Sequence, residues 1–262
     1  MNQGNHAELT WLGTAGFIIK SSKQGSIAFD PYLSRPESAK LSPFKAKDFE
    51  NIDSVFLGHG HFDHAYDIPE IASVCGCQVY AGENTKNRLM NKHGLEAKRF
   101  IHKTDCLNKH FSVRSFKSKH VNFDCALLWT TLKRLNFSQV VDIIKLGINY
   151  PQGETTGYTF ETAGKKFLFL SSAGFTKEET EIYQKENIDV LLLPLQGHTH
   201  ISKIAADFAL KINPKIIIPH HHDNFYPPIS QEIKTDQLKF YLSAGGYKGE
   251  VLEIPLFDTI AI

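Results

Sequence analysis

Short apolar runs recur along most of the chain, and segments rich in glycine, proline and polar residues separate them. Their length and alternation predict β-strands at 9–19 (broken by a turn), 26–30, 52–57, 78–81, 111–118, 157–162, 166–170, 190–193, 216–218 and 251–254. Helical periodicity predicts helices at 67–74, 83–92, 178–186, 203–212 and 236–243. Strands followed by alternating strands and helices, twice over, indicate a layered α/β fold.

The segment 121–157 breaks this rhythm. Its middle has apolar residues at helical spacing, namely Leu128, Leu132, Leu135, Val140, Ile144 and Gly147. It lies between two expected strands, where a compact fold needs only a short turn. We therefore predict one domain, 1–262, with a helical insertion at 121–157. The insertion is either a lid beside a functional site or a helix packed on the core. If its apolar face is open, it would suit an apolar or lipid-like substrate.

Three histidines and one aspartate, His59, His61, Asp63 and His64, fall within six positions directly after the apolar run 55–57. Because side chains alternate along a strand, His59 and His61 point the same way at its end. Asp63 and His64 then lie in the turn that leaves the strand. Imidazole suits Zn, Fe, Mn or Ni, and a neighbouring carboxylate makes the ligand set harder. This spacing predicts a site that holds one divalent metal on one side and a second on the other.

The pattern H-x-H-x-D-H resembles the signature of the metallo-β-lactamase superfamily of metal-dependent hydrolases. The stretches 14–17 and 29–31 are similar to the opening of the branch that contains the ascorbate-phosphate lactonase and the N-acyl-phosphatidylethanolamine phospholipase. The resemblance implies an αββα sandwich, in which two mixed β-sheets pack face to face with helices on both outer sides. It does not name a substrate, because this fold hosts many chemistries.

The resemblance also implies a ligand set. The first metal takes His59, His61 and a later histidine, for which His120 after the strand 111–118 matches. The second metal takes Asp63, His64 and one histidine of the run 220–222. The family places this last ligand two residues after a proline, which selects His221; its neighbours would then orient the ligands.

One position departs from the family pattern. The aspartate that normally bridges the two metals follows the strand that matches 167–170, and Ser172 stands there. A hydroxyl is a poorer bridge than a carboxylate, so the site holds one metal, another acid replaces the aspartate, or catalysis is lost. We expect two metals with a changed ligand set, and Asp223 is the nearest acid. His200 is a candidate proton donor beside Asp63, with helix capping as the alternative.

The functional prediction is hydrolysis of an ester, lactone or phosphodiester bond by metal-activated hydroxide. Two divalent ions, Zn before Mn, Fe or Ni, would lower the pKa of bound water to about 7. The alternatives are a metal-binding protein without hydrolytic activity, suggested by Ser172, and a nuclease of the same superfamily. The net charge of +1 and the absence of a long run of one sign argue against nucleic acid. We expect a small-molecule substrate, apolar or phosphorylated.

Four cysteines, at positions 75, 77, 106 and 125, lack the C-x-x-C spacing of a zinc ribbon or redox loop. We predict free thiols in a reducing compartment. No signal-peptide pattern opens the chain, and it contains no apolar stretch of the roughly 18 residues that suggest a membrane span. A cytoplasmic protein is expected, and the sequence defines no oligomeric state.

Overall fold

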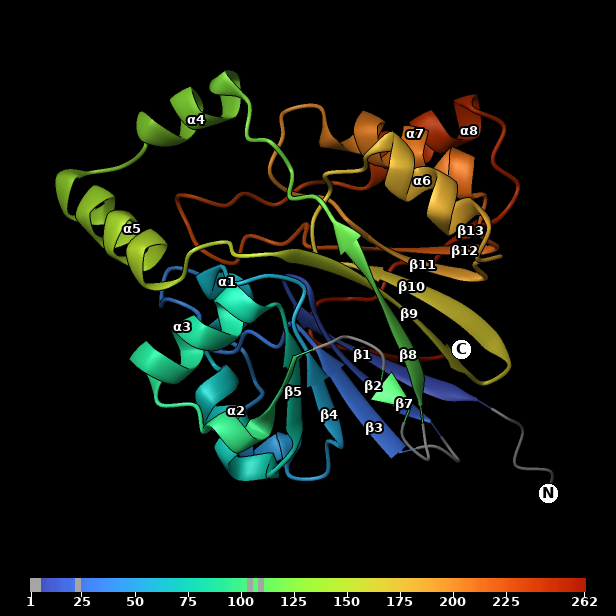
Figure 1. Cartoon of the computed structure of the whole chain (residues 1–262). Helices are drawn as coiled ribbons and strands as arrows, with labels where there is room; N and C mark the ends of the chain where they lie inside the picture. Colours follow the sequence, from blue (N-terminus) through green and yellow to red (C-terminus); the bar gives the residue numbers. More distant parts are fainter. Residues whose placement is uncertain (1–5, 22–24, 103–105, 108–110) are drawn as a thin grey trace.

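Two seven-stranded β-sheets pack face to face in the computed structural model, which describes residues 6–21, 25–102, 106–107 and 111–262 (Figure 1). The first sheet has the order β14-β1-β2-β3-β4-β5-β6, and the second β13-β12-β11-β10-β9-β8-β7. Each sheet is antiparallel in one part and parallel in the other. The strands of the first are β1 Ala7–Gly13, β2 Gly16–Ser21, β3 Gly25–Phe29, β4 Ser54–Phe56, β5 Gln78–Ala81, β6 Phe100–His102 and β14 Thr259–Ala261. Those of the second are β7 Cys106–Leu107, β8 Ser112–Ser118, β9 Thr155–Thr162, β10 Lys165–Leu170, β11 Val190–Pro194, β12 Ile216–His220 and β13 Glu250–Val251.

Aromatic side chains fill the space between the sheets. Phe29 of the first sheet lies 4.7 Å from Phe169 and 5.1 Å from Phe160 of the second, measured between ring centroids. Successive side chains of a strand face opposite ways, so the alternate residues of the same strands face the outer helices. Strand β11 is buried throughout, because one of its faces meets the first sheet and the other meets the helices.

Helices cover both outer faces of the sandwich (Figure 1). Those associated with the first sheet are α1 Phe62–Ala65, α2 Ile68–Cys75 and α3 Glu83–His93, together with the 3₁₀ turns Ala46–Phe49 and Ala97–Arg99. Those over the second are α6 Lys177–Gln184, α7 Ile201–Ile212 and α8 Asp236–Ala244. The αββα sandwich expected from the sequence is thus confirmed. Among the described residues, no helix combines the length and the apolar character that crossing a bilayer requires.

Two helices, α4 Cys125–Leu132 and α5 Phe137–Asn149, connect the neighbouring strands β8 and β9 and project from one edge of the sandwich (Figure 1). We call this segment, 121–149, the arm. Asp124 caps α4, and the Arg88 side chain of α3 donates hydrogen bonds to the carbonyls at the C-terminal end of α5, at 2.9 Å to Asn149. A cation at this end also complements the helix dipole. The helical spacing recognised in the sequence therefore corresponds to two helices with a break at 133–136.

Two details of the sequence analysis require correction. Cys75 and Cys77 form a disulfide, so the prediction of free thiols is wrong for this pair. Helix α2 ends at Gly76, whose left-handed φ of 65° folds the chain back and leaves the two Cα atoms 5.1 Å apart. Cys125 is free and exposed, and the side chain of Cys106 lies outside the described part of the chain. The last strand is β14 rather than 251–254; only its pairing with β1, at the other end of the chain, identifies this short segment.

Candidate metal centre

The H-x-H-x-D-H segment follows the end of β4, close to the residues that follow β10 of the second sheet. Gly58 donates its N–H to Asp30 Oδ1 at 2.6 Å, and its carbonyl accepts a hydrogen bond from Thr156 at 2.7 Å. A Cβ atom on Gly58 would lie 2.0 Å from the Cβ of Ser171. Only glycine fits this contact, which brings His59 to the end of β10.

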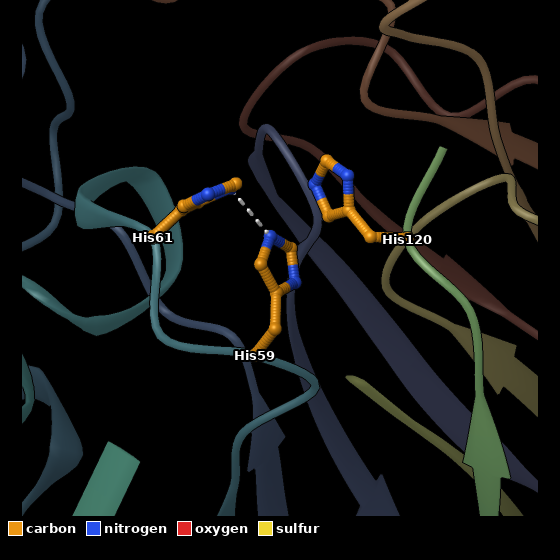
Figure 2. Close-up of side chains that lie close together, drawn as sticks. All are labelled: His59, His61 and His120. Atoms are coloured by element: carbon orange, nitrogen blue, oxygen red, sulfur yellow. Dashed lines mark hydrogen bonds between the residues drawn. The ribbon is translucent and has the colours of Figure 1, made fainter. Parts of the chain in front are cut away.

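His59, His61 and His120 form the first group of possible ligands (Figure 2). Their ring centroids lie 4.7 to 4.8 Å apart in all three pairs, and His59 Nε2 lies 3.1 Å from His61 Nδ1. His120 donates Nδ1–H to the carbonyl of Val121 at 2.7 Å, which leaves a lone pair on Nε2. Burial lowers the pKa of all three imidazoles, to about 4 for His120. The group therefore offers neutral imidazoles, the form that binds metal.

Asp63, His64 and His221 form the second group, and all three are buried. Asp63 Oδ2 lies 3.5 Å from His64 Nε2 and 3.4 Å from His221 Nε2. Burial by itself raises the pKa of Asp63, but the neighbouring imidazoles of His64 and His221 hold it below its usual range. The carboxylate is therefore ionised. The rings of His59 and His64 lie only 3.9 Å apart, so the two groups are adjacent.

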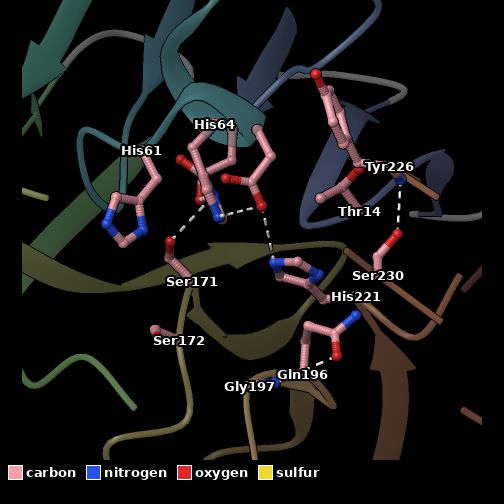
Figure 3. A network of polar contacts seen from close by, with 12 residues as sticks. Thr14, His61, His64, Ser171, Ser172, Gln196, Gly197, His221, Tyr226 and Ser230 are labelled. Atoms are coloured by element: carbon pink, nitrogen blue, oxygen red, sulfur yellow. Dashed lines mark hydrogen bonds and ion pairs between the residues drawn. The ribbon is translucent and has the colours of Figure 1, made fainter. Parts of the chain in front are cut away.

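Asp30 and Ser171 hold the ligand rings in place, and the sequence analysis assigned neither a role. Asp30 is fully buried, and its Oδ2 accepts a hydrogen bond from His64 Nδ1 at 2.8 Å. Ser171 Oγ lies 2.7 Å from His59 Nδ1 and points toward His64 (Figure 3). Asp30 also lies within reach of a metal together with these two histidines, but both of its oxygens already accept hydrogen bonds. The position of Asp30 directly after the apolar strand β3 is the feature of the sequence that could have marked it as a site residue.

Ser172, at the position of the family's bridging aspartate, supports the loop that carries His120. Its Oγ accepts a hydrogen bond from the backbone N–H of Val121 at 3.1 Å. Next to Ser172, a Cβ on Gly174 would lie 2.0 Å from the carbonyl oxygen of Lys119, so the two loops touch along their backbones. Ser172 therefore positions the loop that begins at His120.

The Asp223 carboxylate, which the sequence led us to expect beside the metals, is paired with other groups in the structure. Its Oδ2 forms a buried ion pair with Arg35 at 2.7 Å, and its Oδ1 accepts the N–H of Thr14 at 2.8 Å. Among the described residues it belongs to none of the ligand groups. The carbonyl of Thr14 in turn accepts the N–H of His221, which has a left-handed φ of 56°. Asp223 thus fixes the turn that holds His221.

The remaining histidines of interest lie outside the groups. His200 is exposed at the N-terminus of α7, with its ring 6.0 Å from that of His198, and the structure does not bring it to the ligands. His220 is fully buried between the rings of Phe17 and Phe169. His222 packs on Trp11. Within the run 220–222, His221 alone lies in a ligand group of the described chain.

Weakening the ring-orienting contacts is expected to weaken metal binding without removing a ligand. Asp30→Asn and Ser171→Ala should each reduce the affinity for divalent metal about 10–100-fold, the usual effect of losing such a partner. Competition titration with a chromophoric chelator measures this. Asp207→Asn, an exposed change on α7, is the control and should bind metal like the wild type. Unchanged affinity in both site variants would show that the rings need no support.

The metal-free protein is expected to lose stability as the pH falls from about 6.5 toward 4. Below the ordinary histidine pKa of 6.5, an unfolded chain protonates His59, His61 and His120, whereas burial keeps them neutral in the native state. The native state then binds fewer protons, so acid favours unfolding. Burial also lowers the pKa of His64, but Asp63 and Asp30 raise it by more, so this residue opposes the trend. Urea unfolding at several pH values tests the sign; a midpoint that stays constant or rises toward pH 5 contradicts it.

With this geometry established, comparison with known proteins defines the family. A model described as "Beta-lactamase superfamily domain" matches residues 8–221, so the chain belongs to this superfamily. The chain is 28% identical over 220 residues to a UPF0173 metal-dependent hydrolase of Myxococcus xanthus, covering 83% of this chain and 71% of that relative. It is 26% identical over 229 residues to one of Pyrococcus abyssi, covering 86% and 88%. The sequence-based assignment to a superfamily of metal-dependent hydrolases is confirmed at this level, and no substrate is defined.

Solved structures show the same fold. Igni18, a metallo hydrolase from Ignicoccus hospitalis, superposes with a TM-score of 0.70 at 20% identity and covers 98% of both chains. An isothiocyanate hydrolase from Delia radicum gut bacteria gives a TM-score of 0.69 at 14% identity, covering 97% of this chain and 98% of that one. At such identities the likeness establishes the fold and leaves the reaction of this chain undefined.

Proposed function

We propose that this chain uses two divalent metal ions to hydrolyse an ester, lactone or phosphodiester bond of a small molecule. Zinc is the metal we favour, and manganese, iron and nickel are the alternatives. The observation that carries the proposal is the pair of adjacent ligand groups, His59–His61–His120 and Asp63–His64–His221. Each group offers three ligand atoms that lie within 4.8 Å of one another. Three protein ligands leave coordination positions open for water and substrate, as in catalytic zinc sites.

The residues fit such ions. The imidazoles of the first group are neutral. The Asp30 carboxylate and the Val121 carbonyl accept from Nδ1–H and so fix the tautomers of His64 and His120, and the Ser171 hydroxyl orients His59 through a hydrogen bond with its Nδ1. With metals bound, the site would lower the pKa of water and stabilise the charge that develops on a carbonyl or phosphoryl oxygen. Asp63 is the ionised carboxylate of the second group, and we assign it the role of ligand and acceptor of the proton from the attacking water. We assign His200 no role because its exposed position does not support one.

Aromatic side chains beside the second group support an apolar portion in the substrate. Phe225 lies 5.2 Å from His221, and Tyr226 lies 5.1 Å from Phe62, again between ring centroids. Phe62 begins the helix that carries Asp63 and His64. Phe225 is buried and supports this region from behind, so a substrate whose scissile bond reaches the metals would place its flanking groups against the partly exposed rings of Phe62 and Tyr226.

The test combines metal removal with a substrate panel. Metal-free protein, and protein reloaded with zinc or manganese, would be assayed on p-nitrophenyl esters, lactones and bis-p-nitrophenyl phosphate. We expect turnover of at least one class that requires added metal. The opposite result, full metal loading with no turnover in any class, would favour a metal-binding protein without hydrolytic activity.

A further inference from the structure

The arm carries large apolar side chains that the rest of the chain leaves uncovered. Seven of them are between 48% and 85% exposed: Phe123, Leu128, Trp129, Leu132, Phe137, Ile144 and Ile148. None of the residues of α4 or α5 is buried. At the lower end of the ~150–250 Å² that a large aromatic side chain can bury, the exposed fractions of the seven residues amount to roughly 600 Å². This lies at the upper limit of the ~300–600 Å² apolar patch of a typical monomer and supplies most of the ~800 Å² that each partner contributes to a standard interface.

The outward side of α5 has a symmetrical apolar pattern. Phe137, Val141, Ile144 and Ile148, which we call the outer stripe, are separated by four, three and four residues and so lie on one face of the helix. Leu146, off this stripe, packs against the core of the first sheet and its helices. The spacing reads the same in both directions. An antiparallel copy of α5 would therefore place Phe137 opposite Ile148, and Val141 opposite Ile144.

The charge pattern favours a protein partner over a bilayer. A helix that lies on a membrane combines an apolar face with a strongly charged one. The whole arm has three basic residues, Lys133, Arg134 and Lys145, against the two acidic residues Asp124 and Asp142, and none of the five lies on the outer face of α5 that carries Phe137 and Ile148. The arm therefore lacks a polar face of one strong sign, whereas a surface rich in aromatic and aliphatic side chains and poor in charge is typical of the centre of a protein interface.

We propose that the outer stripe of α5, together with the apolar residues of α4, is the interface with a second copy of this chain. A two-fold axis would run between two antiparallel α5 helices, since a self-complementary patch forms a closed dimer. Helix α5 also contacts α1, which carries Asp63 and His64. Dimerisation would therefore hold the arm in a fixed position beside the second metal group.

The oligomeric state of the whole protein tests this interface. Light scattering after size exclusion, at micromolar concentration, should give twice the monomer mass for the wild type. Phe137→Glu combined with Ile148→Glu should give the monomer mass. Phe240→Glu, an equally exposed apolar residue on α8, is the matched control and should remain dimeric. A monomeric wild type, or a dimer that persists in the double glutamate variant, overturns the proposal.

Cross-linking tests the antiparallel pairing of α5 even if the glutamate variant fails to fold. In a Cys125→Ser background, Phe137→Cys and Ile148→Cys together should give a covalent dimer on mild oxidation, and each alone should not. The two positions lie about 16 Å apart on one helix at 1.5 Å per residue, too far for a disulfide within one chain. The absence of a covalent dimer contradicts the antiparallel pairing. A blue shift of Trp129 fluorescence when a monomer meets phosphatidylglycerol vesicles would identify a bilayer as the partner instead.

Discussion

Replacing His61 with alanine is expected to remove the first metal ion and to abolish hydrolysis. The ligand atoms of the three imidazoles in the first group lie within 4.8 Å of one another. His61 is the more exposed of the two histidines in the H-x-H pair, so its replacement disturbs the packing less than replacement of His59 would. Its loss leaves two ligands, too few for a stable zinc site. The decrease in activity should exceed the roughly 10–100-fold loss that follows removal of an orienting partner. Metal content by mass spectrometry, together with turnover of whichever substrate the panel identifies, measures both effects.

His200→Ala is the matched control for this experiment. It also removes one histidine, but this residue is exposed at the start of α7 and makes no side-chain capping bond. Metal content and turnover should equal those of the wild type. If His61→Ala kept its full metal content, the first ligand group would be wrong. If His200→Ala lost activity with its metals retained, the sequence-based role of His200 as a proton donor would be restored.

Asp223→Ala is expected to reduce the stability of the protein more than any other change near the centre. Its carboxylate pairs with Arg35, whose side chain is 0% exposed, so the substitution leaves a buried charge without its partner. Breaking such a pair costs about 3–5 kcal/mol, which corresponds to a decrease in Tm of roughly 10 °C for a chain of this size. The measurement uses metal-free protein, because bound metal would add its own stabilisation.

A second variant separates the ion pair from a role in metal binding. Arg35→Met combined with Asp223→Ala removes both charges and should recover part of the lost stability. Asp207→Ala breaks an exposed pair with Lys203 and should change stability by less than about 1 kcal/mol. If Asp223→Ala left the Tm unchanged but removed one metal, the carboxylate would be a ligand after all, and the sequence-based expectation would be correct.

The sequence was most informative where residues adjacent along the chain act together. The histidines and the aspartate at 59–64 lie at a strand end, so their clustering could be predicted from the residues, whereas His120 and His221 were expected only because the family resemblance implies them. The orienting contacts could not be predicted, because Ser171 reaches His59 only through the close contact between the sheets at Gly58. The resemblance itself rested partly on the stretch that contains Asp30, but only the packing shows that its carboxylate faces His64.

Asp223 shows why proximity in sequence is a weak guide to the position of a side chain. It lies two residues after His221, yet the left-handed backbone at His221 turns the chain so that the next acid faces Thr14 and Arg35. Arg35 lies far away in the sequence, and nothing in the local pattern indicates a buried cation there. The disulfide of Cys75 and Cys77 was missed for a related reason, since it depends on the left-handed conformation of Gly76.

Anomalous diffraction from crystals of zinc-loaded protein, collected at the zinc edge, would locate the metal ions directly. We predict two peaks a short distance apart, one among His59, His61 and His120 and the other among Asp63, His64 and His221. We also predict that the Asp223 carboxylate remains paired with Arg35. A single peak would contradict the two-metal centre, and a second ion bound by Asp223 would contradict its ligand set.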